Sequence, residues 1–415
     1  MAFVGLQAQD TYLQCGNIID MKSGKISAQK TIVISGNTIK SIENGFVSGG
    51  ANDKIIDLKN KTILPGFIDM HVHIEQEFTP KTYTDRFTQN EADVAFESTV
   101  FAKRTLMAGF TTVRDLGGTG VNIALRNAID RGTVPGPRIF TAGKAIATTG
   151  GHADPTNGMR KELTGNPGPK DGVINSPEDA KKAVRQRYKD GSDVIKITAT
   201  GGVLSVAKNG QNPQFTIEEI KAITATANDY GMLTAAHAHG DEGMQRAIKG
   251  GIKTIEHGTY MSDETMDLMK QYNTFLVPTI TAGKQVEEKA KVPGFFPEVV
   301  AKKASEIGPL IQDMFRRAYK KGVPIAFGTD AGVFPHGLNA KEFGYMVEVG
   351  MPPMKALQSA TITNAELLGM EANLGQLKAG FLADIIAVEA NPLDTIATLE
   401  NVVFVMKNGV VYKGE

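Results

Sequence analysis

The seven histidines are the residues whose types and spacing say most about chemistry: His71, His73, His152, His237, His239, His257 and His336. His71 and His73 are two residues apart, and alternate residues of a strand point to the same side, so both imidazoles can reach one ion. Neutral imidazoles together with carboxylates suit zinc, manganese, iron or cobalt. Two histidines at this spacing also occur by chance, but their setting in LPGFIDMHVH favours a metal site.

Four of these histidines and one aspartate stand at the ends of predicted strands: His71, His73, His237, His257 and Asp330. A single histidine at a strand end is most often a packed or hydrogen-bonded core residue. In a barrel of parallel strands, however, the carboxyl ends converge on one rim, where active sites are found. The convergence of all five residues on that rim therefore predicts a metal site.

Lys196 lies in an otherwise apolar strand, DVIKITA, where its ammonium would have to be buried. Burial of an unpaired ammonium is costly and favours the neutral amine. One interpretation is a salt bridge to a carboxylate on a neighbouring strand. The other, which we favour because the fourth strand faces the histidines, is an amine carboxylated by carbon dioxide that offers oxygen ligands to two cations. Arg114 and Asp115, at the end of the second strand, are instead expected to form an ion pair.

The middle of the chain, residues 64–369, alternates short apolar runs with longer helical patterns. The runs that predict strands cover residues 66–71, 111–115, 138–142, 193–199, 232–237, 253–257, 274–278 and 324–330. Helices are predicted between them, for example over residues 179–190 and 217–229, each after an N-capping pattern. Eight such units fit a closed (β/α)8 TIM barrel better than an open doubly wound sheet, and no G-x-G-x-x-G follows the first strand.

Both ends of the chain are rich in short β-branched and apolar runs separated by turn residues. Asn408 and Gly409 between two such runs are a strong hairpin signal. Neither end has enough strands for a stable core of its own. We therefore expect an α/β protein in which residues 10–63 plus 370–415 form a composite β-sandwich domain beside the barrel of residues 64–369.

The composition excludes several classes of protein. The 415 residues include 45 Lys+Arg and 45 Asp+Glu, a balance that argues against nucleic acid or an anionic membrane as a partner. Cys15 is the only cysteine, which excludes disulfide scaffolds and cysteine-rich metal sites. No apolar run approaches the ~20 residues of a membrane span. Residues 1–9 are similar to the tail of an export signal, so we expect an exported or periplasmic protein, with a cytoplasmic one as the alternative.

Six pieces of the sequence are together highly specific: LPGFIDMHVH, GFTTVRDLGG, DVIKITATGG, LTAAHAHG, TIEHGT and FGTDAG. With the closing GFLADIIAVEANPL, they make the chain resemble the amidohydrolase superfamily of metal-dependent hydrolases over nearly its whole length, including the split β-sandwich. The combination is most similar to the branch that contains imidazolonepropionase-related proteins, Xaa-Pro dipeptidase-like proteins, carboxypeptidases acting on N-acyl or dipeptide substrates, and ochratoxin-hydrolysing amidases.

The resemblance implies a site for two divalent metal ions, which we expect to be zinc. The ligands that it implies are His71, His73, Lys196, His237, His257 and Asp330. The H-x-H pair and the aspartate would hold the more buried ion, the two later histidines would hold the other, and carboxylated Lys196 would bridge them. A hydroxide between the ions would be the nucleophile. Asp330 would also be the catalytic acid–base that takes a proton from the attacking water and passes it to the leaving amine.

Four further residues are candidates for substrate binding: His239, Tyr260, His152 and His336. His239 could bind a substrate carboxylate or oxyanion, and Tyr260 could donate its hydroxyl to the developing oxyanion. His152 and His336 lie in loops rich in glycine or proline, and loops at this rim often form the substrate wall. For each of the four, a core or loop position without a functional role is the alternative.

We expect the enzyme to cleave an amide or peptide bond adjacent to a free carboxylate, in a short peptide or another small molecule. Dipeptides, N-acyl amino acids and ochratoxin-type amides fall in this class. One alternative is a cyclic-amide hydrolase of the imidazolonepropionase kind, whose relatives typically have a single-metal site in which a bridging Lys196 would have no purpose. The other is a non-catalytic metal-binding barrel, although no predicted ligand is missing. The resemblance also implies a homo-oligomer.

Overall fold

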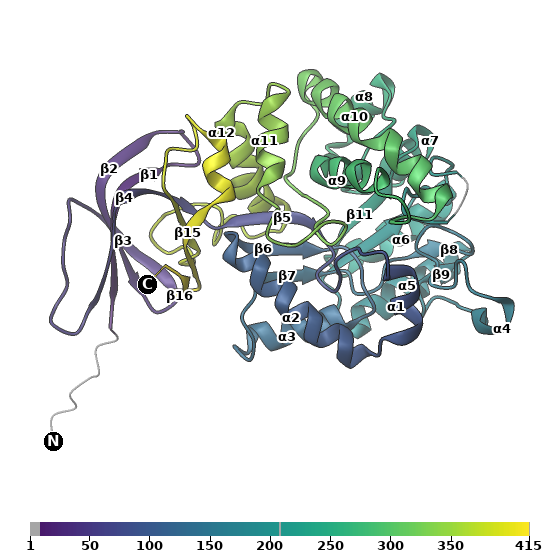
Figure 1. The fold of residues 1–415 in the computed structure, drawn as a ribbon, viewed down its shortest axis with the longest axis horizontal. Helices are drawn as coiled ribbons and strands as arrows, with labels where there is room; N and C mark the ends of the chain where they lie inside the picture. The colour runs from purple at the N-terminus through teal and green to yellow at the C-terminus, as the bar shows by residue number, and fades with distance from the viewer. Residues whose placement is uncertain (1–8, 207–208, 415) are drawn as a thin grey trace.

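The computed structural model describes residues 9–206 and 209–414, which form a β-rich lobe and a larger α/β lobe (Figure 1). Described residues of both chain ends share one seven-stranded sheet in the β-rich lobe, with the order β16-β15-β14-β4-β1-β2-β3. Its strands are β1 (Thr11–Ile19), β2 (Ile26–Ser35), β3 (Thr38–Asn44), β4 (Lys54–Pro65), β14 (Ile385–Val388), β15 (Val402–Lys407) and β16 (Val410–Lys413).

The apolar faces of these strands enclose a core that neither end could build alone. Leu13, Ile32 and Ile56 from the N-terminal strands pack in one cluster with Ile385 and Phe404 from the C-terminal strands. The predicted hairpin is confirmed, because β15 and β16 pair antiparallel around a turn with two left-handed residues, at φ angles of 50° and 77°. The sheet also bends back on itself, because β3 at its edge exchanges backbone hydrogen bonds with residues 380–383.

The α/β lobe is built on parallel strands of the TIM-barrel type. One sheet has the order β5-β6-β7 and another the order β10-β11-β12-β13. The strands of this lobe are β5 (Phe67–Val72), β6 (Phe110–Asp115), β7 (Arg138–Thr141), β8 (Ala147–Thr148), β9 (Val173–Ile174), β10 (Val194–Thr198), β11 (Leu233–Ala238), β12 (Thr254–His257) and β13 (Phe275–Val277). The short pair β8 and β9 was not predicted.

Helices follow the strands and cover their outer faces (Figure 1). They are α1 (Thr82–Thr88), α2 (Glu91–Met107), α3 (Val121–Asp130), α4 (Lys161–Thr164), α5 (Pro177–Asp190), α6 (Ile217–Asp229), α7 (Asp241–Lys249), α8 (Asp263–Tyr272), α9 (Ile280–Ala290), α10 (Glu298–Lys321), α11 (Lys341–Glu348), α12 (Pro353–Gln358), α13 (Asn364–Leu367), a π-helical turn η1 (Ser359–Thr363) and a 3₁₀ turn η2 (Ile396–Glu400). The helices predicted over residues 179–190 and 217–229 are confirmed as α5 and α6. The Ser176 side chain caps α5, and Thr216 with Glu219 forms a capping box on α6.

Residues 324–330, predicted as the eighth strand, are extended but do not form a regular strand. Their backbone bonds to β13 on one side, through Leu276 N and Pro324 O at 2.9 Å, and to β5 on the other, through Asp330 N and His71 O at 2.7 Å. The Asn364 side chain donates to the carbonyl oxygens of Ile68 and Phe327, at 2.8 and 2.9 Å. This amide thus adds to the backbone bonds between the two segments, such as the one from Met70 N to Phe327 O at 3.0 Å.

In the part of the chain that the structure describes, no helix has both the length and the apolar character needed to cross a bilayer. The apolar start, interpreted above as the tail of an export signal, lies in residues 1–8, outside the described residues.

Candidate metal centre

The strand ends of the α/β lobe bring the six predicted metal ligands to one cavity of about 760 Å³. β5 positions His71 and His73, β10 positions Lys196, β11 and β12 position His237 and His257, and the segment after residue 324 positions Asp330. The ligand atoms form two groups, each spanning less than 4.8 Å: one of His71, His73 and Asp330, and one of His237, His239 and His257. Thus His239, predicted to bind substrate, lies in the same group as two predicted ligands.

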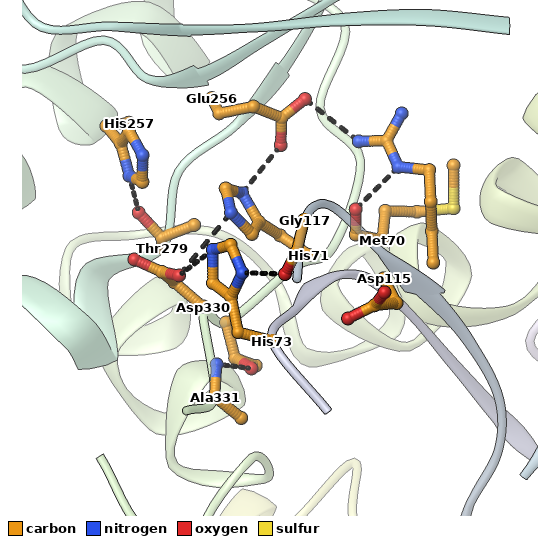
Figure 2. Close-up of polar contacts among 12 residues, drawn as sticks. Met70, His71, His73, Asp115, Gly117, Glu256, His257, Thr279, Asp330 and Ala331 are labelled. Atoms are coloured by element: carbon orange, nitrogen blue, oxygen red, sulfur yellow. Dashed lines mark hydrogen bonds and ion pairs between the residues drawn. The ribbon is translucent and has the colours of Figure 1, made fainter. Parts of the chain in front are cut away.

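In the first group, two imidazole nitrogens face one carboxylate oxygen (Figure 2). Nε2 of His71 and Nε2 of His73 each lie 3.4 Å from Oδ1 of Asp330. Nδ1 of His71 faces a carboxylate oxygen of Glu256 at 2.9 Å, and Nδ1 of His73 faces the Gly117 carbonyl at 2.8 Å. Both of these partners accept hydrogen bonds, so each neutral ring holds its proton on Nδ1 and presents a lone pair at Nε2.

This arrangement fits a cation. His71 Nε2 and Asp330 Oδ1 are buried and have no hydrogen-bond partner among the described residues. Burial and, to a smaller extent, the Lys196 charge lower the pKa of His71 well below its usual value and that of His73 to about 4. A second proton on either ring is therefore unfavourable, and lone pairs that face a carboxylate oxygen across 3.4 Å could hold a positive ion between them.

The second group is also composed of neutral rings. Burial lowers the pKa of His239 to about 3 and the pKa values of His237 and His257 well below their usual value. Nε2 of His237 lies 3.0 Å from the Gly201 carbonyl, so its lone pair is on Nδ1. Nδ1 of His257 lies 2.7 Å from the Thr279 hydroxyl (Figure 2). These contacts fix the ring orientations and leave one nitrogen of each available to an ion.

Lys196 is buried between charged groups, with 4% of the residue exposed. Burial lowers the pKa of its amine and Arg114 lowers it further, whereas Glu256 and Asp330 act in the opposite direction. Burial also raises the pKa of Asp330. A lysine with a lowered pKa is more often a neutral amine, which is the form that can react with carbon dioxide.

Two of the predicted ligands lie in the left-handed region of backbone space. The φ angles are 73° at His257 and 61° at Asp330, and neither residue is glycine. Such conformations cost roughly 1–3 kcal/mol and cluster at functional sites, where the surrounding structure enforces them. The main chain is thus held in an unfavourable conformation at the point where these two side chains turn into the cavity.

The remaining substrate-binding candidates occupy different environments. His152 lines the cavity, and its Nδ1 is buried without a partner among the described residues. Tyr260 lines an adjoining cavity of about 440 Å³, which shares His239 with the first. His336 is not among the residues that line either cavity; its ring stacks on Phe101 and bonds the Thr105 hydroxyl and the carbonyls of residues 73 and 76.

The expected ion pair between Arg114 and Asp115 is wrong. The Arg114 guanidinium bonds the Glu256 carboxylate at 2.8 Å, and Asp115 accepts hydrogen bonds from the Asn122 and Thr141 side chains. Consecutive residues of a strand point to opposite faces, which separates the two side chains. Sequence reasoning also missed Glu256, although its place directly before His257 in TIEHGT was an available signal.

Comparison with known proteins gives several strong matches. The model of the amidohydrolase family matches residues 62–413. A solved structure of a Xaa-Pro dipeptidase with methionine bound in its active site is 54% identical, with a TM-score of 0.95 over 98% of this chain and all of the other. A prolidase structure complexed with N-methylphosphonate-L-proline is 30% identical, with a TM-score of 0.89, and the match again covers 98% of this chain and all of the other. Ochratoxinase from Aspergillus niger is 33% identical over 370 residues, which cover 85% of this chain and 76% of ochratoxinase.

Proposed function

Because the chain belongs to the amidohydrolase family, we propose that it cleaves the amide or peptide bond next to a free carboxylate in dipeptides and N-acyl amino acids. The membership confirms the resemblance predicted from the motifs, and it makes the chain a hydrolase that acts on amide bonds. The observation that carries the proposal is the pair of ligand groups, one of His71, His73 and Asp330 and one of His237, His239 and His257, in a single cavity.

Two divalent ions, with zinc as the expected metal, fit these residues. His71, His73 and Asp330 would hold one ion, His237 and His257 would hold the other, and a carboxylated Lys196 would provide oxygen atoms to both. When bound, such ions polarise the scissile carbonyl and lower the pKa of water. Nε2 of His71 and Oδ1 of Asp330 are buried and have no hydrogen-bond partner among the described residues, which supports this assignment.

The chain's own residues supply proton transfer. Asp330 accepts the proton of the attacking water on its carboxylate and returns it to the nitrogen of the leaving amine. Asp330 lines the cavity beside His71 and His73, which supports its contact with the attacking water. Positioned groups of this kind contribute roughly 10² to 10⁴ in rate.

The cavity wall supports an amide substrate with an apolar side chain. Phe78, Val203, Leu204, Val286 and Ile307 line the side of the cavity that faces α9 and α10. The methionine bound by the Xaa-Pro dipeptidase has such a side chain together with a free carboxylate.

Three of the polar candidates keep the roles proposed from the sequence. His152 would contact the substrate with its unpartnered Nδ1, His239 would bind the carboxylate where the two cavities meet, and Tyr260 would donate its hydroxyl to the developing oxyanion. We assign His336 an indirect part, in which it holds the backbone of residues 73 and 76.

The same proposal includes the architecture that surrounds the site. A closed (β/α)8 barrel over residues 64–369 is supported by the bonds of residues 324–330 to β13 and β5, and by the bond from Asp193 N to Thr141 O at 2.7 Å, which links the start of β10 to β7. The sheet shared by the chain ends supports a β-sandwich domain of residues 10–63 plus 370–415.

The test combines metal analysis with a substrate screen. We expect about two equivalents of metal per chain, as two-metal hydrolysis requires, and turnover of dipeptides or N-acyl amino acids that a chelator abolishes. A single equivalent together with turnover of cyclic amides alone would contradict the proposal in favour of an imidazolonepropionase-like activity. Bound metal without turnover on any amide of the screen would instead indicate a binding protein.

A further inference from the structure

A fully buried ion pair lies directly behind the first metal-ligand group. Arg114 on β6 and Glu256 on β12 have no exposed side-chain surface, and one guanidinium nitrogen lies 2.8 Å from Oε1 of Glu256. Burying two charges costs more than their attraction returns unless further hydrogen bonds satisfy them. The hydrogen-bond partners of this pair therefore show what its two charges are used for.

Every polar group of the pair has a specific partner. Arg114 donates from Nε to the Met70 carbonyl at 2.6 Å, and from its terminal nitrogens to the Thr254 hydroxyl at 3.0 Å and to Oε1 of Glu256. The Thr254 hydroxyl donates to the same oxygen at 2.5 Å. Oε1 is thus fully used by two donors, and Oε2 is directed to Nδ1 of His71 at 2.9 Å (Figure 2).

We propose that Arg114 and Glu256 are positioning residues for His71, and that Arg114 acts through Glu256. Arg114 and Thr254 hold Oε1 and so fix the rotation of the carboxylate, which directs Oε2 to accept from His71. The ring must then hold its proton on Nδ1 and present the Nε2 lone pair toward Asp330. This inference rests on the proposed function only in assuming that a cation binds there.

The alternative is that the pair merely links β5, β6 and β12 within the core. Apolar residues of similar volume would pack these strands at least as well, since replacing a buried ion pair in this way is often neutral or stabilising. An apolar pair could not accept the imidazole proton, however. The contact between Glu256 and His71 therefore distinguishes a positioning role from a packing role, and carboxylates in this position typically change metal affinity by 10- to 100-fold.

Glu256→Gln tests the contact with little change in shape. Arg114 and Thr254 would still donate hydrogen bonds to the amide oxygen, so the amide nitrogen would face Nδ1 of His71. The carboxylate acceptor thereby becomes a donor, which forces the His71 proton onto Nε2, where it blocks the ion. Because this variant leaves a buried charge on Arg114, the double variant R114M/E256L, which removes both charges and the acceptor, is measured beside it.

The readout is binding of Co²⁺ in competition with a chelator, together with the visible d–d absorption of the bound ion and the thermal midpoint. We expect both variants to bind the ion of the His71 group 10- to 100-fold more weakly with an altered absorption spectrum, and the double variant to keep a cooperative transition. The control is R138M/D384N, which removes another ion pair whose two side chains are little exposed. In this pair the nitrogen and oxygen atoms lie 2.9 Å apart and link β7 to the β-rich lobe. It should bind Co²⁺ as the wild type does.

A folded double variant with wild-type affinity and spectrum would overturn the positioning role. The result is separable from the proposed function, because Co²⁺ binding requires no substrate. Wild-type protein that binds Co²⁺ tightly, loses affinity on Glu256→Gln and cleaves no amide would refute the function and support the positioning role. Wild-type protein that cleaves amides beside variants with unchanged Co²⁺ binding would do the reverse.

Discussion

The proton position on each buried imidazole decides which nitrogen can bind a cation, and neighbouring groups fix that position. The carbonyls of Gly117 and Gly201 can only accept, so His73 holds its proton on Nδ1 and His237 holds its proton on Nε2. The carboxylate of Glu256 does the same for His71. The orientation of these rings is thus set by neighbouring groups, whereas the roles proposed for Lys196 and Asp330 are chemical, so their substitutions should have different effects.

Lys196→Ala should abolish turnover and lower the metal content, because it removes the proposed bridge between the two ions. Short carboxylic acids added to this variant should restore part of the activity by occupying the vacated position. Metal analysis and amide turnover with and without added acid measure both effects. Lys144→Ala, which removes another lysine that lines the cavity, is the control for metal content. Wild-type activity in the Lys196 variant would refute its assignment.

Asp330→Asn should separate metal binding from proton transfer. The amide keeps an oxygen at the position of Oδ1, so the metal content should stay largely unchanged, but it cannot accept a proton from water. We expect kcat to fall by roughly 10² to 10⁴, the usual contribution of a positioned acid–base group. Parallel measurements of kcat and of bound metal decide the matter, and a variant that retains most of the wild-type kcat would exclude Asp330 from this role.

At the residue scale, the sequence predicted the side-chain positions that follow from the alternation of residues along a strand. His71 and His73 reach one site because alternate residues of a strand share a side. The pairing of Arg114 with Glu256 could not be predicted in the same way. The two residues are 142 positions apart and lie on strands that are not neighbours in either sheet, so only the closing of the lobe brings them together.

At the element scale, the loop after β10 links the cavity wall to its surroundings. Tyr83 on α1 donates to the Leu204 carbonyl at 3.0 Å, and Lys303 on α10 donates to the Gly202 and Ser205 carbonyls at 2.8 and 2.7 Å. Gly202 itself lies against the ring of His152, so closely that any Cβ atom at this position would overlap the imidazole. The loop therefore determines where His152 can lie.

Gly202→Ala should displace His152, whose ring centroid lies 4.4 Å from that of His237, so metal content is measured beside activity. The backbone at Gly202 does not have a positive φ angle, so the methyl group acts through its contact with the ring rather than through backbone strain. We expect kcat/KM to fall by roughly 10²-fold, as for a misplacement of about 1 Å, with unchanged metal content. Gly168→Ala is the matched control, because a Cβ atom there meets nothing within 4 Å. Full activity in the Gly202 variant would show that His152 does not contact the substrate.

Helices and strands were predictable at this scale because each carries a local signal. The capping box of α6 and the turn between β15 and β16 are each determined by residues that lie close together in the sequence. The loops around the cavity carry no such periodicity. Their course depends on single contacts between distant segments, such as Arg86 with the Pro155 and Asn157 carbonyls, and these form only after the lobe has folded.

At the scale of the whole molecule, the two lobes are joined by charged residues with little exposure. Arg138, where β7 begins, bonds Asp384 at 2.9 Å and the Asn408 side chain at 2.6 Å. Asp384 also accepts from the Asn408 backbone amide, and the Lys407 side chain donates to the Gly136 carbonyl. The sequence predicted that the chain ends combine, but not which residues bind them to the α/β lobe.

Asp384→Ala should therefore destabilise the whole molecule rather than the site. It leaves the Arg138 guanidinium, whose side chain is 15% exposed, without its carboxylate, and removal of one partner of a buried pair costs about 3 kcal/mol or more. Denaturant unfolding followed by circular dichroism should show this loss in the free energy of unfolding, while the folded variant keeps its metal content. R138M/D384N should regain much of the loss, because it removes both charges. An Asp384→Ala variant as stable as the wild type would mean that the ion pair does not hold the lobes together.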